Sequence, residues 1–231
     1  MRVALLHGFA GDPSVWDDVE LAGEIERVAI ALPGHVRACD VARDWEANLD
    51  LVARAIAGCE LAIGYSLGAR VALGLVARGA IQRAILISVN PGIDDGERAA
   101  RRASDAAWTR VLRDDGIAAF ADRWSAQPLF ATQSRAEPAR LARRRAARLA
   151  RDPEQLARSL EAMGLAEMPD YRAAFPADRV ALVAGADDAK FAAIARSLAA
   201  CGAPLELLAG CGHDPTLEQP RALGAAISRL L

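Results

Sequence analysis

Short apolar runs alternate with longer amphipathic stretches along most of the chain. Six apolar runs are bounded by glycine, proline or polar residues, which is typical of buried strands. They span residues 2–6, 27–32, 61–63, 84–88, 179–184 and 204–208. Stretches with the apolar spacing of helices follow five of them, at residues 15–22, 44–57, 67–76, 191–200 and 220–231. This alternation predicts an α/β fold with a mostly parallel sheet, flanked by helices and joined by right-handed crossovers.

Residues 90–175 have a different pattern. Apolar residues recur there only at helical spacing, and no run is typical of a strand. Helices are expected at residues 97–112, 117–124, 139–150 and 153–163. We therefore predict a core formed by residues 1–89 and 176–231, and a helical cap insertion formed by residues 90–175 over the C-terminal edge of the sheet.

Composition and charge narrow the class of protein. The chain has 231 residues, of which 53% are hydrophobic, so one domain with an insertion can bury a sizeable core. The net charge of −2 argues against a general attraction to nucleic acid or membranes. Apolar runs are too short to span a membrane, and no signal peptide is expected. The four cysteines lack metal-site or disulfide spacing, which favours a cytoplasmic protein without a metal or cofactor; they are Cys39, Cys59, Cys201 and Cys211.

A serine stands at the turn between a predicted strand and a predicted helix. Gly64 and Gly68 flank Ser66 in the pattern G-x-S-x-G. The serine needs a strained backbone conformation, and a Cβ two residues away on either side would clash. The helix that begins after it points N-terminal amides toward an anion formed beside the serine. In this strand–turn–helix setting, the pattern is typical of the nucleophile elbow of α/β-hydrolases.

Two further loops that follow predicted strands carry Asp188 and His213. Loops after the C-terminal ends of parallel strands gather at one edge of the sheet. A histidine in a glycine-containing loop is ordinarily a solvated turn residue, but the order serine, acid, histidine is that of α/β-hydrolases. It predicts that His213 accepts the proton of Ser66 while Asp188 holds the imidazole. Asp187 competes for the role of the acid; the spacing of three residues from Gly185 favours Asp188.

An oxyanion hole is expected beside the serine. One donor would be the backbone N–H of Leu67, the residue after the predicted nucleophile. The other would be the backbone N–H of Phe9, in the glycine-containing loop after the first strand. The Phe9 side chain can pack inward as in an ordinary turn without changing this role of its backbone.

These patterns belong to a longer series of motifs that covers nearly the whole chain. The series comprises Leu6-His7-Gly8-Phe9, Leu32-Pro33-Gly34-His35, Gly64 to Arg70, Asn90-Pro91-Gly92-Ile93, Glu97-Arg98 with Arg101 and Asp105, Trp124 to Phe130, Arg148 with Asp152-Pro153, Asp188 to Phe191, and Gly212-His213. With it the chain resembles the MenH family, the 2-succinyl-6-hydroxy-2,4-cyclohexadiene-1-carboxylate synthases of menaquinone biosynthesis. The motifs around the serine are shared by a large superfamily. W-x-x-Q-P-x-F and the arginine series distinguish this family better from the other members of that superfamily.

The resemblance implies a lyase. The family eliminates pyruvate from 2-succinyl-5-enolpyruvyl-6-hydroxy-3-cyclohexene-1-carboxylate, with no ester to hydrolyse. Ser66, primed by His213 and Asp188, would act as a base that removes a ring proton. The amides of Phe9 and Leu67 would hold the negative charge that develops on the adjacent ketone oxygen.

The resemblance also implies a set of substrate-binding residues. The small-molecule substrate carries several carboxylates, which guanidinium groups bind in a bidentate way. Arg70, Arg101 and Arg148 would supply these cations, and Tyr65 and Trp124 would line the pocket. Trp124 could equally be core of the cap.

Several alternatives stay open. The chain is rich in arginine, and Arg143-Arg144-Arg145 is expected to include a solvated helix face. The loop after His35 carries Val36-Arg37-Ala38, and Asp214-Pro215-Thr216 follows His213, where the family often has other residues. A carboxylesterase that uses Ser66 as a nucleophile is the first rival, and a non-catalytic binding protein of the same fold is the second. The oligomeric state is left open.

Overall fold

The structure is a computed structural model that describes residues 1–35 and 41–231. Cys39 and the Val36-Arg37-Ala38 segment lie outside the described residues. The strands are β1 (Arg2–Leu6), β2 (Glu26–Ile30), β3 (Leu61–Tyr65), β4 (Arg83–Ile87), β5 (Val180–Gly185) and β6 (Leu205–Leu208). The helices are η1 (Pro13–Trp16), α1 (Trp45–Ala55), α2 (Leu67–Ala77), α3 (Asp95–Arg110), η2 (Val111–Asp115), α4 (Gly116–Ser125), η3 (Pro128–Arg135), α5 (Pro138–Leu149), α6 (Pro153–Met163), α7 (Ala189–Ala199), α8 (Pro215–Glu218) and α9 (Pro220–Leu230).

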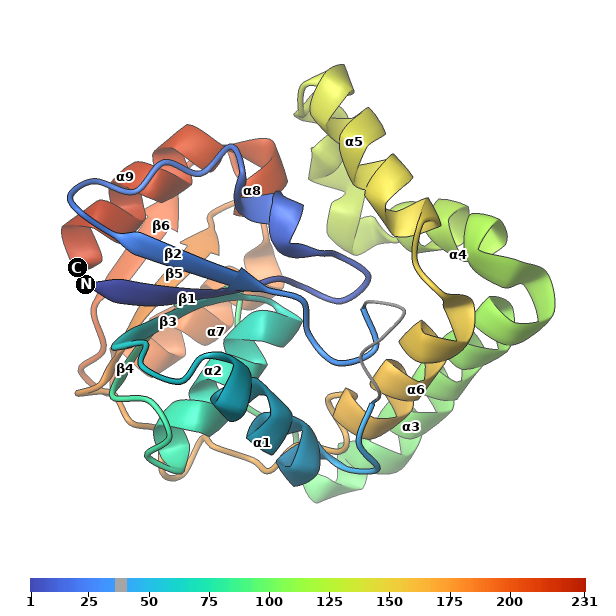
Figure 1. Ribbon diagram of the computed structural model, residues 1–231, viewed down its shortest axis with the longest axis horizontal. Coiled ribbons are helices and arrows are strands. Elements are labelled where there is room, and N and C mark those ends of the chain that lie inside the picture. Colours follow the sequence, from blue (N-terminus) through green and yellow to red (C-terminus); the bar gives the residue numbers. More distant parts are fainter. Residues whose placement is uncertain (36–40) are drawn as a thin grey trace.

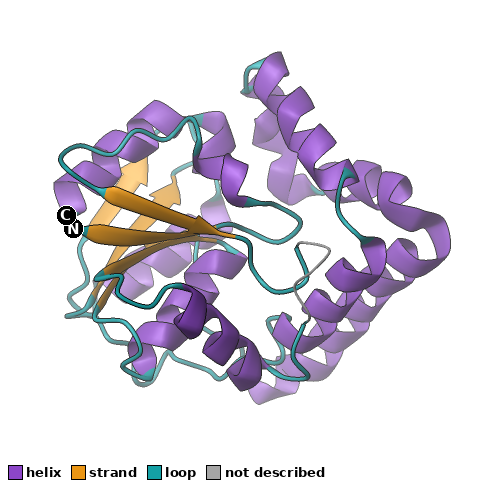
Figure 2. Cartoon of the chain, viewed as in Figure 1, coloured by secondary structure: helices purple, strands orange, loops and turns teal. Residues whose placement is uncertain are grey.

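The strands form one twisted sheet in the order β2-β1-β3-β4-β5-β6 (Figure 1). Every pairing between these strands is parallel. Parallel strands need a crossover connection each time, and helices supply most of them (Figure 2). The predicted α/β-hydrolase fold, with a parallel sheet flanked by helices, is confirmed.

Side chains alternate between the two faces of the sheet and bury two separate cores. Val3 and Leu5 of β1 join a cluster with η1 and α9, whereas Ala4 and Leu6 join a cluster with α1, α2 and α7. The period of two along β1 therefore continues into both layers of helices. Because both faces are covered, the central strands are buried almost throughout, which explains their continuous apolar runs.

A helical insert, which we define as α3 to α6, lies between β4 and β5 in the chain and beyond the C-terminal edge of the strands (Figure 1). Its own apolar cluster is centred on Leu112, Phe120 and Leu156 and reaches the core at Ala10. The helices predicted in this segment are all present. The division into a core of residues 1–89 and 176–231 and a cap of residues 90–175 stays a prediction.

Two local expectations differ from the structure. The helix expected at residues 15–22 is only the 3₁₀ turn η1, because Asp12 caps a turn that ends at Trp16. Val15 packs into the core from η1, and Val19 does so from the irregular backbone that follows. The short helices η3 and α8 were not expected; each has proline at its first turn, where the missing N–H costs nothing.

Candidate active site

Ser66 occupies a tight turn between β3 and α2. Its backbone has φ 52° and ψ −107°, a conformation that residues other than glycine rarely adopt. A Cβ on Gly64 would lie 2.2 Å from the carbonyl oxygen of Gly68, and a Cβ on Gly68 would lie 2.2 Å from that of Leu6. The two glycines are thus required by the close approach of backbone on both sides of the serine.

Ser66, His213 and Asp188 meet at the C-terminal edge of the sheet. His213 Nε2 lies 3.4 Å from Ser66 Oγ, and His213 Nδ1 lies 2.7 Å from Asp188 Oδ2. His213 and Asp188 are both buried. Asp188 also accepts the Phe191 amide through Oδ1, so its carboxylate is fixed at the N-terminus of α7.

Asp187 has a different environment from its neighbour. Its carboxylate pairs with Arg135 of η3, and the side chain is 34% exposed. Asp188 instead points at the imidazole of His213. The geometry favours Asp188 over Asp187 as the partner of the histidine.

The loop that carries His213 is held by polar contacts on several sides. Ser88, which follows β4 with φ 52°, donates its hydroxyl to the carbonyl oxygen of His213 over 2.9 Å. Glu218 accepts the amides of Gly212 at 2.7 Å and Asp214 at 3.2 Å, the residues on either side of the histidine. The backbone of His213 is therefore fixed independently of its side chain.

The amides expected to form the oxyanion hole are available. In the described part of the chain, neither the Phe9 N–H nor the Leu67 N–H has a hydrogen-bond acceptor. Leu67 begins α2, where the first amides of a helix have no partner within the helix. Both residues line the pocket that contains Ser66.

Two buried histidines hold the backbone around the Phe9 loop by hydrogen bonds. His7 Nε2 accepts a hydrogen bond from the Leu32 amide, and His35 Nε2 accepts one from the Ala10 amide; both N···N distances are 3.0 Å. Each Nδ1 then carries the proton and donates to a backbone carbonyl, that of Gly8 or Pro33. Burial lowers the pKa of His7 to about 4 and that of His35 to about 3, so both rings stay neutral at physiological pH.

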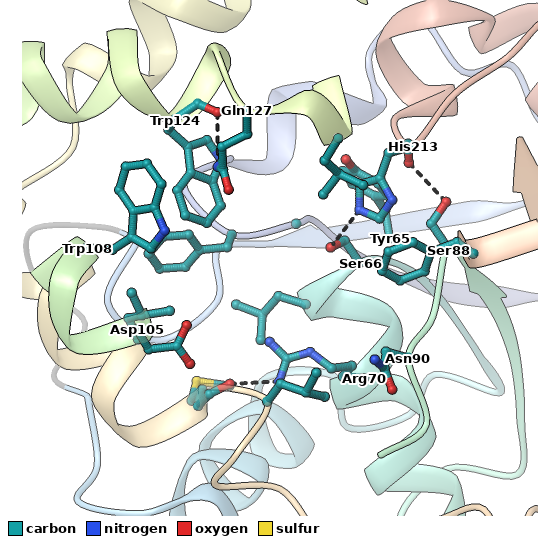
Figure 3. A pocket seen from close by; sticks show the side chains of 18 of the residues that line it. Tyr65, Ser66, Arg70, Ser88, Asn90, Asp105, Trp108, Trp124, Gln127 and His213 are labelled. Atoms are coloured by element: carbon teal, nitrogen blue, oxygen red, sulfur yellow. Dashed lines mark hydrogen bonds between the residues drawn. The ribbon is translucent and has the colours of Figure 1, made fainter. Parts of the chain in front are cut away.

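A cavity of about 200 Å³ separates the sheet edge from the helical insert. Figure 3 shows Ser66 and His213 on one side of it, with Trp108 and Trp124 on the other. Aromatic rings form much of the wall: Trp124 stacks on Phe120 with ring centroids 5.2 Å apart. The pocket thus has polar side chains, Ser66 and His213, on one side and an apolar, aromatic wall on the other.

Arg70 reaches this cavity from α2. Its Nη1 donates to the Met163 carbonyl over 2.8 Å, and the guanidinium lies 5.8 Å from the centre of the Trp45 ring. Among the described residues, no carboxylate lies within ion-pair distance of Arg70. Desolvation, and then the neighbouring charge of Arg101, lower the pKa of Arg70 to about 9. A cation held in this way favours an anionic ligand.

Arg101 reaches the same cavity from α3. Its Nε lies 3.0 Å from both carboxylate oxygens of the buried Asp105. This contact uses one edge of the guanidinium and leaves the Nη groups for other partners. Asp105 also lies close enough to raise the pKa of Arg70, against the effect of Arg101. The pocket therefore brings together two cations and one acid.

Arg148 is buried but does not line the main cavity. It borders a smaller cavity of about 20 Å³ behind Phe9 and Trp124. Its Nη1 donates to Ser125 Oγ over 2.7 Å, and its Nε has no partner among the described residues. Burial lowers its pKa to about 10. Tyr65 borders both cavities, and burial raises the pKa of its hydroxyl.

Sequence reasoning missed part of this site. Trp108, Phe120 and Phe191 form walls of the pocket or pack against its rings, and Phe191 lies 4.3 Å from the His213 ring between centroids. Trp108 and Phe120 lie outside the motifs named in the sequence, so no sequence pattern assigned them to the pocket. Arg143 and Arg145 lie on an exposed helix face, as expected of this run, whereas the Arg144 side chain is 13% exposed and pairs with the buried Asp214.

Neither the lengths of the helices nor the state of the cysteines depends on the pocket. No helix in residues 1–35 and 41–231 has the length and apolar character needed to cross a membrane. Cys59, Cys201 and Cys211 are free thiols.

Comparison with known proteins places this geometry in a family. Residues 3–226 match the model of the alpha/beta hydrolase family. The 2-succinyl-6-hydroxy-2,4-cyclohexadiene-1-carboxylate synthase of Klebsiella pneumoniae subsp. pneumoniae is 34% identical over 241 residues, covering 99% of this chain and 93% of that protein. The enzyme of the same name from Shigella dysenteriae serotype 1 is 31% identical with the same coverage.

Solved structures agree with this assignment. MenH from S. aureus matches with a TM-score of 0.89 and 26% identity, covering 98% of this chain and 91% of that one. A thermophilic esterase from Thermogutta terrifontis matches with a TM-score of 0.82 and 23% identity, covering 100% and 89%, which is a likeness of fold. The chain belongs to the alpha/beta hydrolase family and, within it, to the family of the 2-succinyl-6-hydroxy-2,4-cyclohexadiene-1-carboxylate synthases.

Proposed function

We propose that the protein is a lyase of menaquinone biosynthesis. It would eliminate pyruvate from 2-succinyl-5-enolpyruvyl-6-hydroxy-3-cyclohexene-1-carboxylate and form 2-succinyl-6-hydroxy-2,4-cyclohexadiene-1-carboxylate. Its relatives at 34% and 31% identity bear the name of this synthase. One observation carries the proposal: a single pocket holds both the Ser66–His213 pair and the two guanidinium groups of Arg70 and Arg101.

The reaction begins with a proton transfer. His213, oriented by Asp188, takes the hydroxyl proton of Ser66 as Ser66 Oγ removes a proton from the ring carbon next to the succinyl ketone. Charge that develops on the ketone oxygen is held by the amides of Phe9 and Leu67. A double bond then forms between ring carbons 2 and 3, the existing double bond shifts to carbons 4 and 5, and the ether bond between carbon 5 and oxygen breaks. The enolpyruvyl oxygen leaves with the electron pair and takes the proton from the imidazolium of His213, and the released enolpyruvate tautomerises to pyruvate.

Recognition of the substrate falls to the cations of the pocket. A small polycarboxylate suits two arginines better than a neutral ester does, since each carboxylate can accept paired N–H donors. Arg70 and Arg101 are the first candidates, and Arg148 would act from the adjoining cavity. Tyr65 and Trp124 would border the ring of the substrate. We place this reaction in the cytoplasm, with a small molecule and not a nucleic acid as the partner.

A carboxylesterase is the second candidate. The same Ser66–His213–Asp188 arrangement would support attack on an ester and an acyl-enzyme. The aromatic wall of the pocket, with Trp108 and Phe130, is the observation that favours it. An arrangement with all three polar groups in contact argues against a non-catalytic binding protein.

The deciding experiment measures two reactions of the wild-type chain. Pyruvate release from the enzymatically generated intermediate is followed together with the absorbance of the diene product, and a p-nitrophenyl ester serves as counter-substrate. We expect rapid pyruvate release and slow ester cleavage. Rapid ester cleavage without pyruvate release would overturn the proposal in favour of the esterase.

A further inference from the structure

Helix α5 of the insert turns one row of arginines toward the core. Arg140, Arg144 and Arg148 recur every four residues and so lie on one side of the helix. Their neighbours Arg143 and Arg145 are 61% and 53% exposed and pair with surface acids. Within the inward row, Arg144 occupies the position that reaches the loop after β6.

Arg144 bridges the insert and the loop that carries His213. Its Nη1 lies 2.7 Å from Asp214 Oδ2, and its Nη2 donates to Thr216 Oγ1 over 3.0 Å. The Asp214 side chain is only 3% exposed. A buried carboxylate depends on such a partner, since its own charge is poorly solvated in the interior.

Asp214 directly follows His213 in the chain, so a contact that holds Asp214 also restricts the position of His213. Asp214 Oδ1 accepts the Leu217 amide at 3.2 Å and the Thr216 hydroxyl at 2.6 Å. Its own amide donates to Glu218. Residues 214–218, which directly follow His213, are therefore joined as one hydrogen-bonded unit, to which Arg144 is the charged contact from the insert.

The position of that unit matters for proton transfer. His213 Nε2 is 3.4 Å from Ser66 Oγ, a distance near the outer limit of a hydrogen bond. A displacement of a few tenths of an ångström would break the contact. Asp188 holds the far side of the ring, and Ser88 and Glu218 hold the backbone around it, whereas Arg144 is the contact that comes from the insert.

We propose that Arg144 is a positioning residue that acts through Asp214 on His213, so that seating of α5 completes the contact between His213 and Ser66. The inference rests on the roles given above to Ser66 and His213. It differs from direct substrate binding: both Nη groups of Arg144 are engaged, and Arg144 borders the small rear cavity and a surface groove, not the cavity that contains Ser66.

The test combines steady-state kinetics with labelling of Ser66 by a small organophosphate, which needs His213 but no carboxylate-binding arginine. We expect Arg144→Gln to lower both kcat for pyruvate release and the labelling rate roughly tenfold or more, while KM stays within about twofold. Arg143→Gln, at the exposed neighbouring position, is the matched control and should change neither rate.

A second substitution makes the route through Asp214 visible. Arg144→Gln combined with Asp214→Asn removes both charges and leaves no buried, unpaired carboxylate. We expect the double variant to label no more slowly than Asp214→Asn alone, and faster than Arg144→Gln. If Arg144→Gln does not fold, Arg144→Lys, which can reach Asp214 but not Thr216 at the same time, should show a smaller loss in the same two rates.

The outcomes separate this inference from the proposed function. If Ser66→Ala were labelled as fast as the wild type, the catalytic roles of Ser66 and His213 would be contradicted. Labelling that depends on Ser66 but is equal in wild type and Arg144→Gln would overturn only the role of Arg144. A rise in KM without a change in labelling would mean that Arg144 binds substrate instead.

Discussion

The two walls of the pocket are built in different ways. On the sheet side, Ser66, His213 and Phe9 each follow a strand, and close backbone contacts such as that at Gly64 restrict their positions. On the insert side, Arg101, Trp108 and Trp124 project from helices, and their positions depend on side-chain packing. In the proposed function, the sheet edge carries the chemistry, and recognition is shared between the helical insert and Arg70 of α2. Loops and insertions can then change the substrate without changing the reaction machinery.

The largest effect is expected on the sheet side, at the serine. Ser66→Ala should lower kcat for pyruvate release roughly 10⁴-fold, with little change in KM, because it removes the group that takes the ring proton. The measurement is steady-state pyruvate release. Ser134→Ala, an exposed serine on η3, is the matched control. Full activity of Ser66→Ala would assign the base to another residue.

The next effect distinguishes two adjacent carboxylates. Asp188→Asn should lower kcat roughly 10³-fold, because the amide can no longer hold the imidazole in the tautomer that accepts a proton from Ser66. Asp187→Asn should cost no more than about twofold, since its partner is the exposed Arg135. The same pyruvate assay compares them, and the reverse ranking would reassign the acid.

The insert side should respond through binding. Arg101→Ala should raise KM for the polycarboxylate and lower kcat/KM roughly 10- to 100-fold, because a charge-assisted contact to a carboxylate is lost. Arg102→Ala, on the same helix but paired with Glu167 at the surface, should change kcat/KM by less than about twofold. Equal losses in the two variants would mean that α3 acts through its overall charge.

The last effect concerns the support of the sheet edge and changes stability, not the rate of the reaction, as the pH changes. The unfolded chain binds protons at His7 and His35 below pH 6.5, whereas the folded chain does so only near pH 4 and 3. The free energy of unfolding should therefore fall between pH 6.5 and 4, by roughly 1.4 kcal/mol per pH unit for each histidine. Urea denaturation across this range measures it.

His35→Gln provides the reference for that measurement. It removes one of the two histidines, so the decrease with falling pH should be shallower by roughly half of the part due to the pair. A slope unchanged by this substitution would mean that carboxylates alone account for the loss of stability in acid.

The same contrast explains what the sequence could predict. Strand runs, the turn around Ser66 and the loops with Asp188 and His213 are local patterns, and each of these is present within a few residues, whereas the helix expected at residues 15–22 is only a 3₁₀ turn. The spacing of Gly64 and Gly68 predicted the strained turn at Ser66, although the close approach that requires Gly68 is to Leu6 of the neighbouring strand. Fold class and family were therefore within reach, and both are confirmed.

The insert was harder because its contacts depend on how helices pack. Arg143, Arg144 and Arg145 are identical as residues, yet only Arg144 faces a buried acid 70 positions away in the chain. Arg148 was predicted to bind substrate, but it borders a cavity behind the main one. No local spacing distinguishes these environments, since they follow from the angle at which α5 meets the core.

The proposed function divides the pocket into an edge that performs the chemistry and an insert that contributes to selecting the substrate. The sharpest test of this division measures pyruvate release and cleavage of a small p-nitrophenyl ester for Asp188→Asn and Arg101→Ala in parallel. We predict that Asp188→Asn slows both reactions by similar factors, while Arg101→Ala slows only pyruvate release. If Arg101→Ala slowed both reactions equally, the insert would take part in the chemistry and the division would be contradicted.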